Sequence, residues 1–244
     1  MRVAIISDIH GNRHAFEAVL AAAGAEGPDA IWCLGDLVGY GADPDACVAL
    51  ARDHAEVCLA GNHDLAVTGA LPIDEFSPGA AAAVEWTQEK MEPENITYLR
   101  GLRPSDQREG VGLYHASPRD PIWEYVLSPL LAELSLSGMR ERVALIGHSH
   151  VALAFTRPPD GPVSGERRYP DDEADLGGDA GWLLNPGSVG QPRDGDPRAA
   201  WLLLDLDRER AVWQRTEYDI EGAAAAIRAA ELPDSLAQRL QHGQ

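Results

Sequence analysis

The sequence contains few cysteines and no long apolar run. Its three cysteines, Cys33, Cys47 and Cys58, are too few and odd in number for a disulfide framework, so we expect small buried side chains. No apolar run approaches the roughly 18 residues that a membrane-spanning helix needs, which argues against a membrane partner. The first residues lack a secretory signal pattern, because Asp8 and His10 interrupt the apolar start. We therefore expect a cytoplasmic location.

Basic residues are also scarce, with 20 Lys and Arg against 39 Asp and Glu and a formal net charge of −19. Binding a nucleic-acid backbone depends on lysines and arginines that neutralise phosphates. The composition therefore argues against a long nucleic-acid partner, unless a local cationic site overrides the mean charge. Nothing in the residues indicates an oligomeric state.

Short apolar runs alternate with helical patterns in the first half of the chain, which predicts an α/β layered fold. Strands are expected at residues 2–7, 30–35, 56–61, 111–116 and 142–147, and helices at residues 13–25, 43–55 and from 77 to 90. In the second half, strands are expected at residues 151–156, 181–185, 199–206 and 211–218, without intervening helices.

No domain boundary is visible, so we expect a single domain over residues 1–244. Residues 157–181 are rich in proline, glycine and acidic residues, which predicts a flexible insertion, either a solvated loop or a mobile hairpin; a substrate lid is a further alternative. Residues 219–243 are predicted to form two C-terminal helices.

Each of five predicted strands is followed within about two residues by Asp, Asn or His. These residues are Asp8 and His10, Asp36, Asn62 with His63 and Asp64, His115, and His148 with His150. The carboxyl ends of strands form the ligand crevice of α/β sheets, so these side chains are expected to converge. Any one of these motifs alone is an ordinary polar turn. All five in order indicate a metal site.

The order D-x-H, G-D, G-N-H-D, H and G-H-x-H resembles that of the calcineurin-like metallophosphoesterase superfamily. The stretches GDLVGYG (35–41), HASPRDP (115–121) and NPGSVGQPRDG (185–195) resemble its small single-domain bacterial members, and the similarity spans about residues 2–216. The resemblance implies a four-layer αββα sandwich, with two mixed β-sheets face to face and helices outside. It also implies a dinuclear metal centre at the C-terminal ends of the strands.

Seven candidate ligands are too many for one ion that keeps a position open. The resemblance assigns Asp8, His10, Asp36 and His150 to one ion. It assigns Asp36, Asn62, His115 and His148 to the other, with Asp36 bridging. Imidazole and carboxylate ligands without thiolate suit divalent transition metals. We expect two such ions, manganese first, with iron, zinc, cobalt or nickel as alternatives.

Two divalent ions in such a site leave a net positive charge, which suits phosphoryl transfer, and they activate a bound water or hydroxide. The resemblance makes His63 the proton donor to the leaving oxygen or a hydrogen-bond donor to the phosphoryl oxygens. Asp64 is a second candidate catalytic residue, which could orient the His63 ring.

Two further residues are candidates for substrate binding. Asn12 could shape the first loop near the phosphate, or it could simply cap the following helix. Arg193 could contact a substrate phosphate, or it could lie in a solvated turn.

These features predict a metal-dependent phosphoester hydrolase that acts on a small phosphorylated molecule or a phosphoprotein, with a slight preference for phosphodiesters. A serine/threonine protein phosphatase and a dinucleoside polyphosphate hydrolase are the alternatives. The competing class is a catalytically silent scaffold of the same fold. That class predicts lost ligands, whereas all seven ligand positions and His63 are present.

Overall fold

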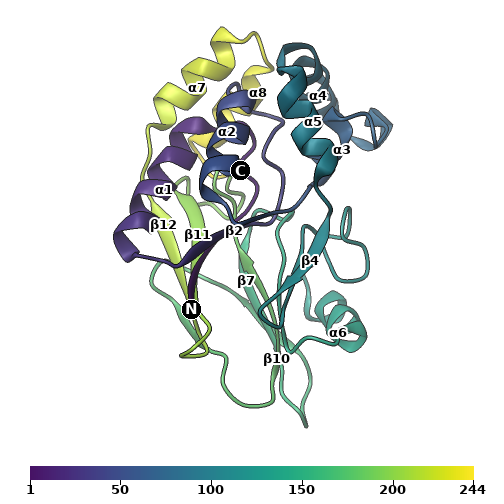
Figure 1. Ribbon diagram of the computed structural model, residues 1–244, viewed down its shortest axis with the longest axis vertical. Coiled ribbons are helices and arrows are strands. Elements are labelled where there is room, and N and C mark those ends of the chain that lie inside the picture. The colour runs from purple at the N-terminus through teal and green to yellow at the C-terminus, as the bar shows by residue number, and fades with distance from the viewer.

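Two mixed six-stranded sheets lie face to face in the computed structural model, which describes residues 1–244 (Figure 1). The first sheet has the order β3 (Val57–Cys58), β2 (Ala30–Cys33), β1 (Arg2–Ile6), β11 (Ala199–Asp205), β12 (Arg210–Thr216), β9 (Glu173–Asp175). The second has the order β4 (Ser105–Arg108), β5 (Val111–Tyr114), β6 (Val143–Leu145), β10 (Gly181–Pro186), β7 (Ala152–Arg157), β8 (Ser164–Arg167).

Each sheet contains a parallel part that determines where loops meet. Strands β1, β2 and β3 are parallel in the first sheet, and β5, β6 and β10 are parallel in the second. The carboxyl ends of parallel strands lie at one edge of a sheet. The loops that follow β1, β2, β3, β5, β6 and β10 can therefore share one end of the sandwich.

Helices cover the outer faces unequally (Figure 1). Seven α-helices belong to the side of the first sheet: α1 (Arg13–Glu26), α2 (Pro44–His54), α3 (Asn62–Val67), α4 (Pro78–Lys90), α5 (Pro93–Gly101), α7 (Ile220–Ala229) and α8 (Asp234–Leu240). A short 3-10 helix, η1 (Ile73–Glu75), precedes α4. Only α6 (Pro129–Gly138) packs on the outer face of the second sheet. The predicted four-layer sandwich is confirmed, with one helical layer reduced to a single helix.

Alternation along the strands divides the core into layers. In β1, Val3 and Ile5 point toward the second sheet, in a cluster of 20 buried residues. Ala4 and Ile6 point the other way, into a cluster of 22 buried residues shared with the helices. Successive side chains of a strand point to opposite faces of the sheet. Because both faces of this strand are buried, nearly every residue in it is apolar.

The segment predicted as a loop, residues 157–181, is partly strand. Strand β8 pairs with β7 at the edge of the second sheet, and β9 pairs with β12 at the edge of the first. Edge strands tolerate charged and exposed side chains. The residues of β8 and β9 are mostly exposed and polar, so their sequence lacks the apolar alternation that predicts a strand. Strands β7 and β8 form the hairpin that was one alternative for this segment, whereas the solvated-loop alternative is wrong over residues 164–167 and 173–175. The two C-terminal helices are found as expected.

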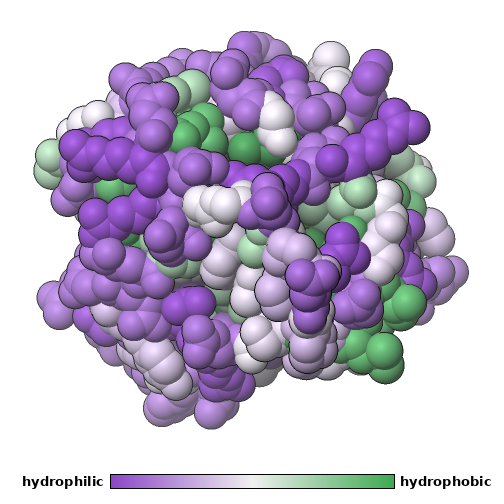
Figure 2. Space-filling model, turned by 90° about the horizontal axis from the view of Figure 1, so that it is seen from below, coloured by the Kyte–Doolittle hydropathy of each residue, from purple (hydrophilic) through white to green (hydrophobic).

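The surface seen in Figure 2 is mostly hydrophilic, with hydrophobic residues in separate groups. The large exposed apolar side chains are Tyr125, Leu127, Leu130, Leu134 and Tyr169. None of the helices combines the length and the apolar character that crossing a bilayer requires.

The layer between the sheets is expected to dominate the free energy of unfolding. Leu202 on β11 is 0% exposed, whereas Leu130 on α6 is 70% exposed. The substitution Leu202→Ala should lower the free energy of unfolding by about 2–5 kcal/mol, because it removes apolar contacts and leaves a cavity. The matched control Leu130→Ala should change it by less than about 0.5 kcal/mol. Urea denaturation measures both, and equal losses would contradict this assignment of the core.

Candidate metal centre

Seven polar side chains meet at the strand ends, buried away from solvent. Asp8 and His10 follow β1, Asp36 follows β2, Asn62 follows β3, His115 follows β5, and His148 and His150 follow β6. Their exposed fractions range from 0% to 4%, although polar residues are normally found at the surface. The predicted convergence is therefore present in the folded chain.

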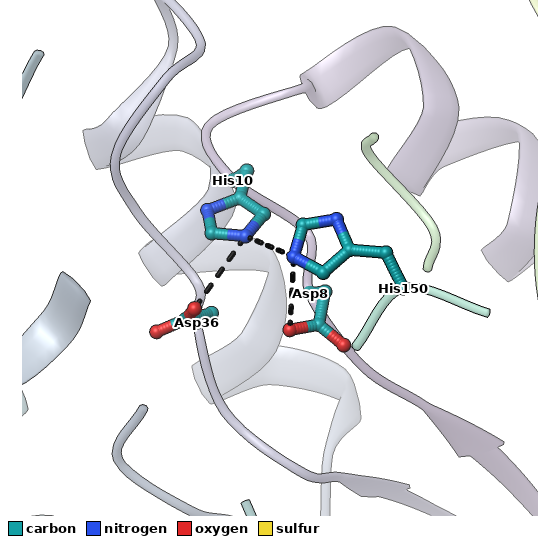
Figure 3. A group of neighbouring side chains, drawn as sticks. All are labelled: Asp8, His10, Asp36 and His150. Atoms are coloured by element: carbon teal, nitrogen blue, oxygen red, sulfur yellow. Dashed lines mark hydrogen bonds and ion pairs between the residues drawn. The ribbon is translucent and has the colours of Figure 1, made fainter. Parts of the chain in front are cut away.

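One group consists of Asp8, His10, Asp36 and His150 (Figure 3). One potential ligand atom from each lies within 4.8 Å of the others. The ring nitrogens Nε2 of His10 and His150 are 3.1 Å apart. Asp36 Oδ2 is 3.5 Å from His10 Nε2, and Asp8 Oδ1 is 3.5 Å from His150 Nε2. All four side chains are thus aimed at one point.

A second group consists of Asp36, His115 and His148. Oδ2 of Asp36 is 3.6 Å from His115 Nε2, so this one oxygen faces a histidine of each group. Asn62 joins the second group, with its Oδ1 at 3.3 Å from His115 Nε2. The two groups share Asp36, in the arrangement that a bridging carboxylate between two ions needs.

The histidine rings are held by backbone carbonyls. Nδ1 of His10 lies 3.0 Å from the Val38 carbonyl, and Nδ1 of His115 lies 2.9 Å from that of Leu34. Nδ1 of His150 lies 2.6 Å from the Gln191 carbonyl. Because a carbonyl can only accept, each Nδ1 carries the proton and each Nε2 presents a lone pair to the site. This outer contact is typical of histidines that bind metals.

The residues fit divalent cations. Asp36 Oδ2 and His148 Nε2 are buried without any hydrogen-bond partner. Burial raises the pKa of Asp8 to about 7 and also raises the pKa of Asp36. Burial lowers the pKa values of His10, His148 and His150, which favours the neutral rings that ligate metals. Cations would satisfy the unpaired atoms, and oxygen and nitrogen donors without thiolate suit Mn, Fe, Co, Ni or Zn.

The backbone is strained at these residues. Asp8, His10, Asp36, His148 and His150 have φ between 50° and 64°, in the left-handed region. Such a conformation costs a non-glycine residue roughly 1–2 kcal/mol. Five of the seven candidate ligands carry this cost, and strain of this kind concentrates at functional sites.

Two glycines allow the loops to approach each other. A Cβ on Gly61 would lie 1.9 Å from Asp36 Oδ1, and one on Gly39 would lie 2.4 Å from His63 Nδ1. Both positions therefore exclude any larger residue.

Asp64 contacts the backbone rather than the His63 ring. Its buried carboxylate accepts N–H groups of Asp36 at 2.8 Å, Gly61 at 2.9 Å and Val38 at 3.2 Å. The structure records no hydrogen bond from Asp64 to His63, so the suggested orienting role was wrong. Asp64 instead fixes the loop that carries Asp36.

His63 lies beside the ligand groups and belongs to neither. Its ring packs against Tyr40 at 4.4 Å, Phe76 at 4.9 Å and His10 at 4.8 Å between centroids. Its Nδ1 is buried and unpartnered. Burial, followed by the charge of Arg193, lowers the pKa of His63.

The two predicted substrate contacts differ in outcome. Asn12 caps α1, with its Oδ1 accepting the Ala15 N–H at 3.1 Å, and its Nδ2 donates to the Gly190 carbonyl at 2.9 Å. Its side chain is therefore fully used, which supports the capping alternative. Arg193 is half-buried. Burial has the largest effect on the pKa values of the first ligand group, and the charge of Arg193 acts to lower all four of them.

Two aromatic rings lie against candidate histidine ligands of the site. Tyr125 stacks on His148, with centroids 4.1 Å apart, and remains 45% exposed. Tyr40 packs on His10 at 4.6 Å. The place of Tyr125 just after the His115 loop allows stacking on a ring as the alternative to a core position, whereas no sequence signal indicated Tyr40.

Residues 1–209 match the model of the calcineurin-like phosphoesterase superfamily domain. The chain belongs to this superfamily. The crystal structure of a metallophosphoesterase from Sphaerobacter thermophilus superimposes with a TM-score of 0.90 at 39% identity, covering 100% of this chain and 99% of that one. An uncharacterised protein of Methanocaldococcus jannaschii is 36% identical over 243 residues, which cover 98% of this chain and 96% of that protein.

The crystal structure of a hypothetical protein from Pyrococcus horikoshii has the same fold, with a TM-score of 0.82 at 21% identity, covering 100% of this chain and 98% of that one. The family and the two Asp/His groups are together consistent with a dinuclear divalent metal centre.

Metal affinity is expected to rise with pH. Without a cation Asp8 has a pKa of about 7, so below pH 7 a metal ion must displace its proton. Displacement of this one proton should make the Mn²⁺ affinity rise by up to about tenfold per pH unit between pH 5.5 and 7. Its contribution should level off above pH 8. The raised pKa of Asp36 adds to the same trend. Calorimetric titration in buffers of different ionisation enthalpy counts the protons released, and a constant affinity from pH 5.5 to 8 would contradict the expectation.

Proposed function

We propose that this protein is a metal-dependent hydrolase of small-molecule phosphate esters, with phosphodiesters slightly ahead of monoesters. The observation that carries the proposal is the pair of ligand groups sharing Asp36 Oδ2, next to a histidine that is not a ligand. When bound, two divalent ions at this spacing of ligands would supply an activated water and positive charge for the phosphoryl oxygens.

The chain's own residues do the remaining work. His63 can donate a hydrogen bond or a proton to an oxygen of the substrate, because it lies against His10 yet has an unpartnered ring nitrogen. Before substrate binds, its lowered pKa favours the neutral ring, which donates through one nitrogen. An anionic substrate next to the ring would favour the protonated form.

A groove of about 580 Å³ adjoins the site and supports a substrate with an organic group. Three of its lining residues also lie beside the candidate ligands, namely Tyr125, Ser149 and Arg193. Apolar surface is added by Leu127, Val151 and Phe155. Ligand sites of small molecules combine apolar walls with a few polar groups in this way. A protein phosphatase and a dinucleoside polyphosphate hydrolase remain the alternatives, and a silent scaffold is disfavoured by the complete ligand set.

Hydrolysis of two chromogenic esters tests the proposal. Protein stripped of metal and reloaded with Mn²⁺ should hydrolyse bis-p-nitrophenyl phosphate and, more slowly, p-nitrophenyl phosphate. Asp36→Asn should lower both rates by at least about 100-fold, because metal catalysis supplies several kcal/mol. Asp74→Asn, at an exposed position, is the matched control. Faster cleavage of the monoester would reverse the preference, and inactivity with every transition metal would favour the scaffold.

The role of His63 is testable through the leaving group. His63→Ala should lower kcat for phenyl phosphate by about 10²–10⁴, because the poorer leaving group depends more on the proton or hydrogen bond. The loss for p-nitrophenyl phosphate should be smaller. The control His14→Ala lies on α1, outside the ligand groups. Equal losses for both esters would argue that His63 has only a structural role.

A further inference from the structure

Two arginines near the metal centre have no carboxylate partner. Arg193 follows β10, and Arg239 lies on α8. Most ion pairs of this acidic chain join an arginine to Asp or Glu, as in Arg215 with Asp194 and Arg228 with Asp234. Neither Arg193 nor Arg239 forms such a pair, although 39 acidic residues are available. Both side chains are half-buried, so water does not fully compensate for the missing partner.

Both guanidinium groups converge on one neutral acceptor. Gln191 Oε1 accepts from Arg193 Nη2 at 2.7 Å and Nε at 3.3 Å, and from Arg239 Nη1 at 3.2 Å. Both groups also lie over the Tyr40 ring, at 5.6 Å and 6.0 Å from its centroid. Burial, followed by the charge of Arg193, lowers the pKa of Arg239. Two like charges held together with no carboxylate in ion-pair contact favour the binding of an anion.

This arginine pair is directly connected to the metal centre. Tyr40, on which both guanidinium groups lie, packs its ring on His10 and His63. The Arg193 N–H donates to the His150 carbonyl at 3.1 Å, and the Gln191 carbonyl accepts from the His150 ring. The pair is therefore separated from His63 by the Tyr40 ring, and Arg193 lies on the loop whose Gln191 carbonyl orients the candidate ligand His150.

We propose that Arg193 and Arg239 form a second anion subsite, and that the substrate is a phosphoester carrying a second phosphate group, as in a bisphosphate or a polyphosphate. Guanidinium groups bind phosphate through paired N–H donors, and Gln191 holds these donors in place before the ligand arrives. In this assignment α8 contributes to substrate specificity through Arg239, which lies beyond residue 209, where the match to the superfamily domain ends. The catalytic meaning of the subsite rests on the hydrolase proposed above.

The alternative is that Arg239 only fastens α8 to the loop of Gln191. A binding measurement separates the two roles without depending on catalysis. Metal-stripped full-length protein is titrated with inorganic pyrophosphate at low salt by calorimetry, so that the metal centre does not contribute. Arg239→Gln should weaken pyrophosphate binding by at least about tenfold, and Arg239→Lys by less, because the charge remains.

Arg140→Gln is the matched control, since Arg140 is an exposed residue after α6. It removes the same charge and should leave pyrophosphate binding unchanged. The proposal is overturned if the native chain does not bind pyrophosphate, or if Arg239→Gln binds it as tightly as the native chain. A lower melting temperature of Arg239→Gln with unchanged binding would assign Arg239 the fastening role.

An activity measurement links the subsite to the substrate. Thymidine 5′-(p-nitrophenyl phosphate) and its 3′-phosphorylated counterpart differ by one phosphate and release the same chromophore. With Mn²⁺ the native protein should prefer the 3′-phosphorylated ester by at least about tenfold in kcat/KM, and Arg239→Gln should bring this ratio close to 1. A native ratio of 1 would contradict the substrate class. Inactivity on both esters would contradict the hydrolase instead, and pyrophosphate binding would still decide the subsite.

Discussion

The burial of the Asp8 and Asp36 carboxylates is the constraint on which the rest of the site depends. A buried carboxylate without compensation costs several kcal/mol, and here two of them lie close to each other. Neutral histidine rings surround them, so the protein itself supplies no cation among the ligands. Divalent ions would compensate these carboxylates, and the ligands that would hold the ions come from both sheets.

The loops that carry these residues are held in a costly backbone conformation. Five left-handed residues at roughly 1–2 kcal/mol each amount to about 5–10 kcal/mol, comparable with the whole free energy of unfolding of a typical domain. Asp64 partly offsets this cost by accepting three backbone N–H groups, and the Ser188 hydroxyl adds a bond to the Asp8 carbonyl. The closely packed layer between the two sheets fixes the strands from which these loops emerge.

Much of this arrangement could be predicted from the sequence, because strand ends and metal ligands follow a local pattern. The alternation of apolar runs indicated the sheets, and the polar residue after each run indicated the ligands. Arg239 could not be found this way, since its partners Gln191 and Tyr40 are distant in sequence and lie in different loops. The β8 and β9 pairs were also hidden, because edge strands need no apolar alternation.

The position of the candidate ligands across two sheets has a consequence for the order of folding. Asp8, His10, Asp36 and Asn62 follow strands of the first sheet, whereas His115, His148 and His150 follow strands of the second. Neither sheet alone can offer a complete ligand set, so a tight metal site arises only after the sheets have docked. Metal ions would then stabilise the docked native state by mass action rather than guide early folding.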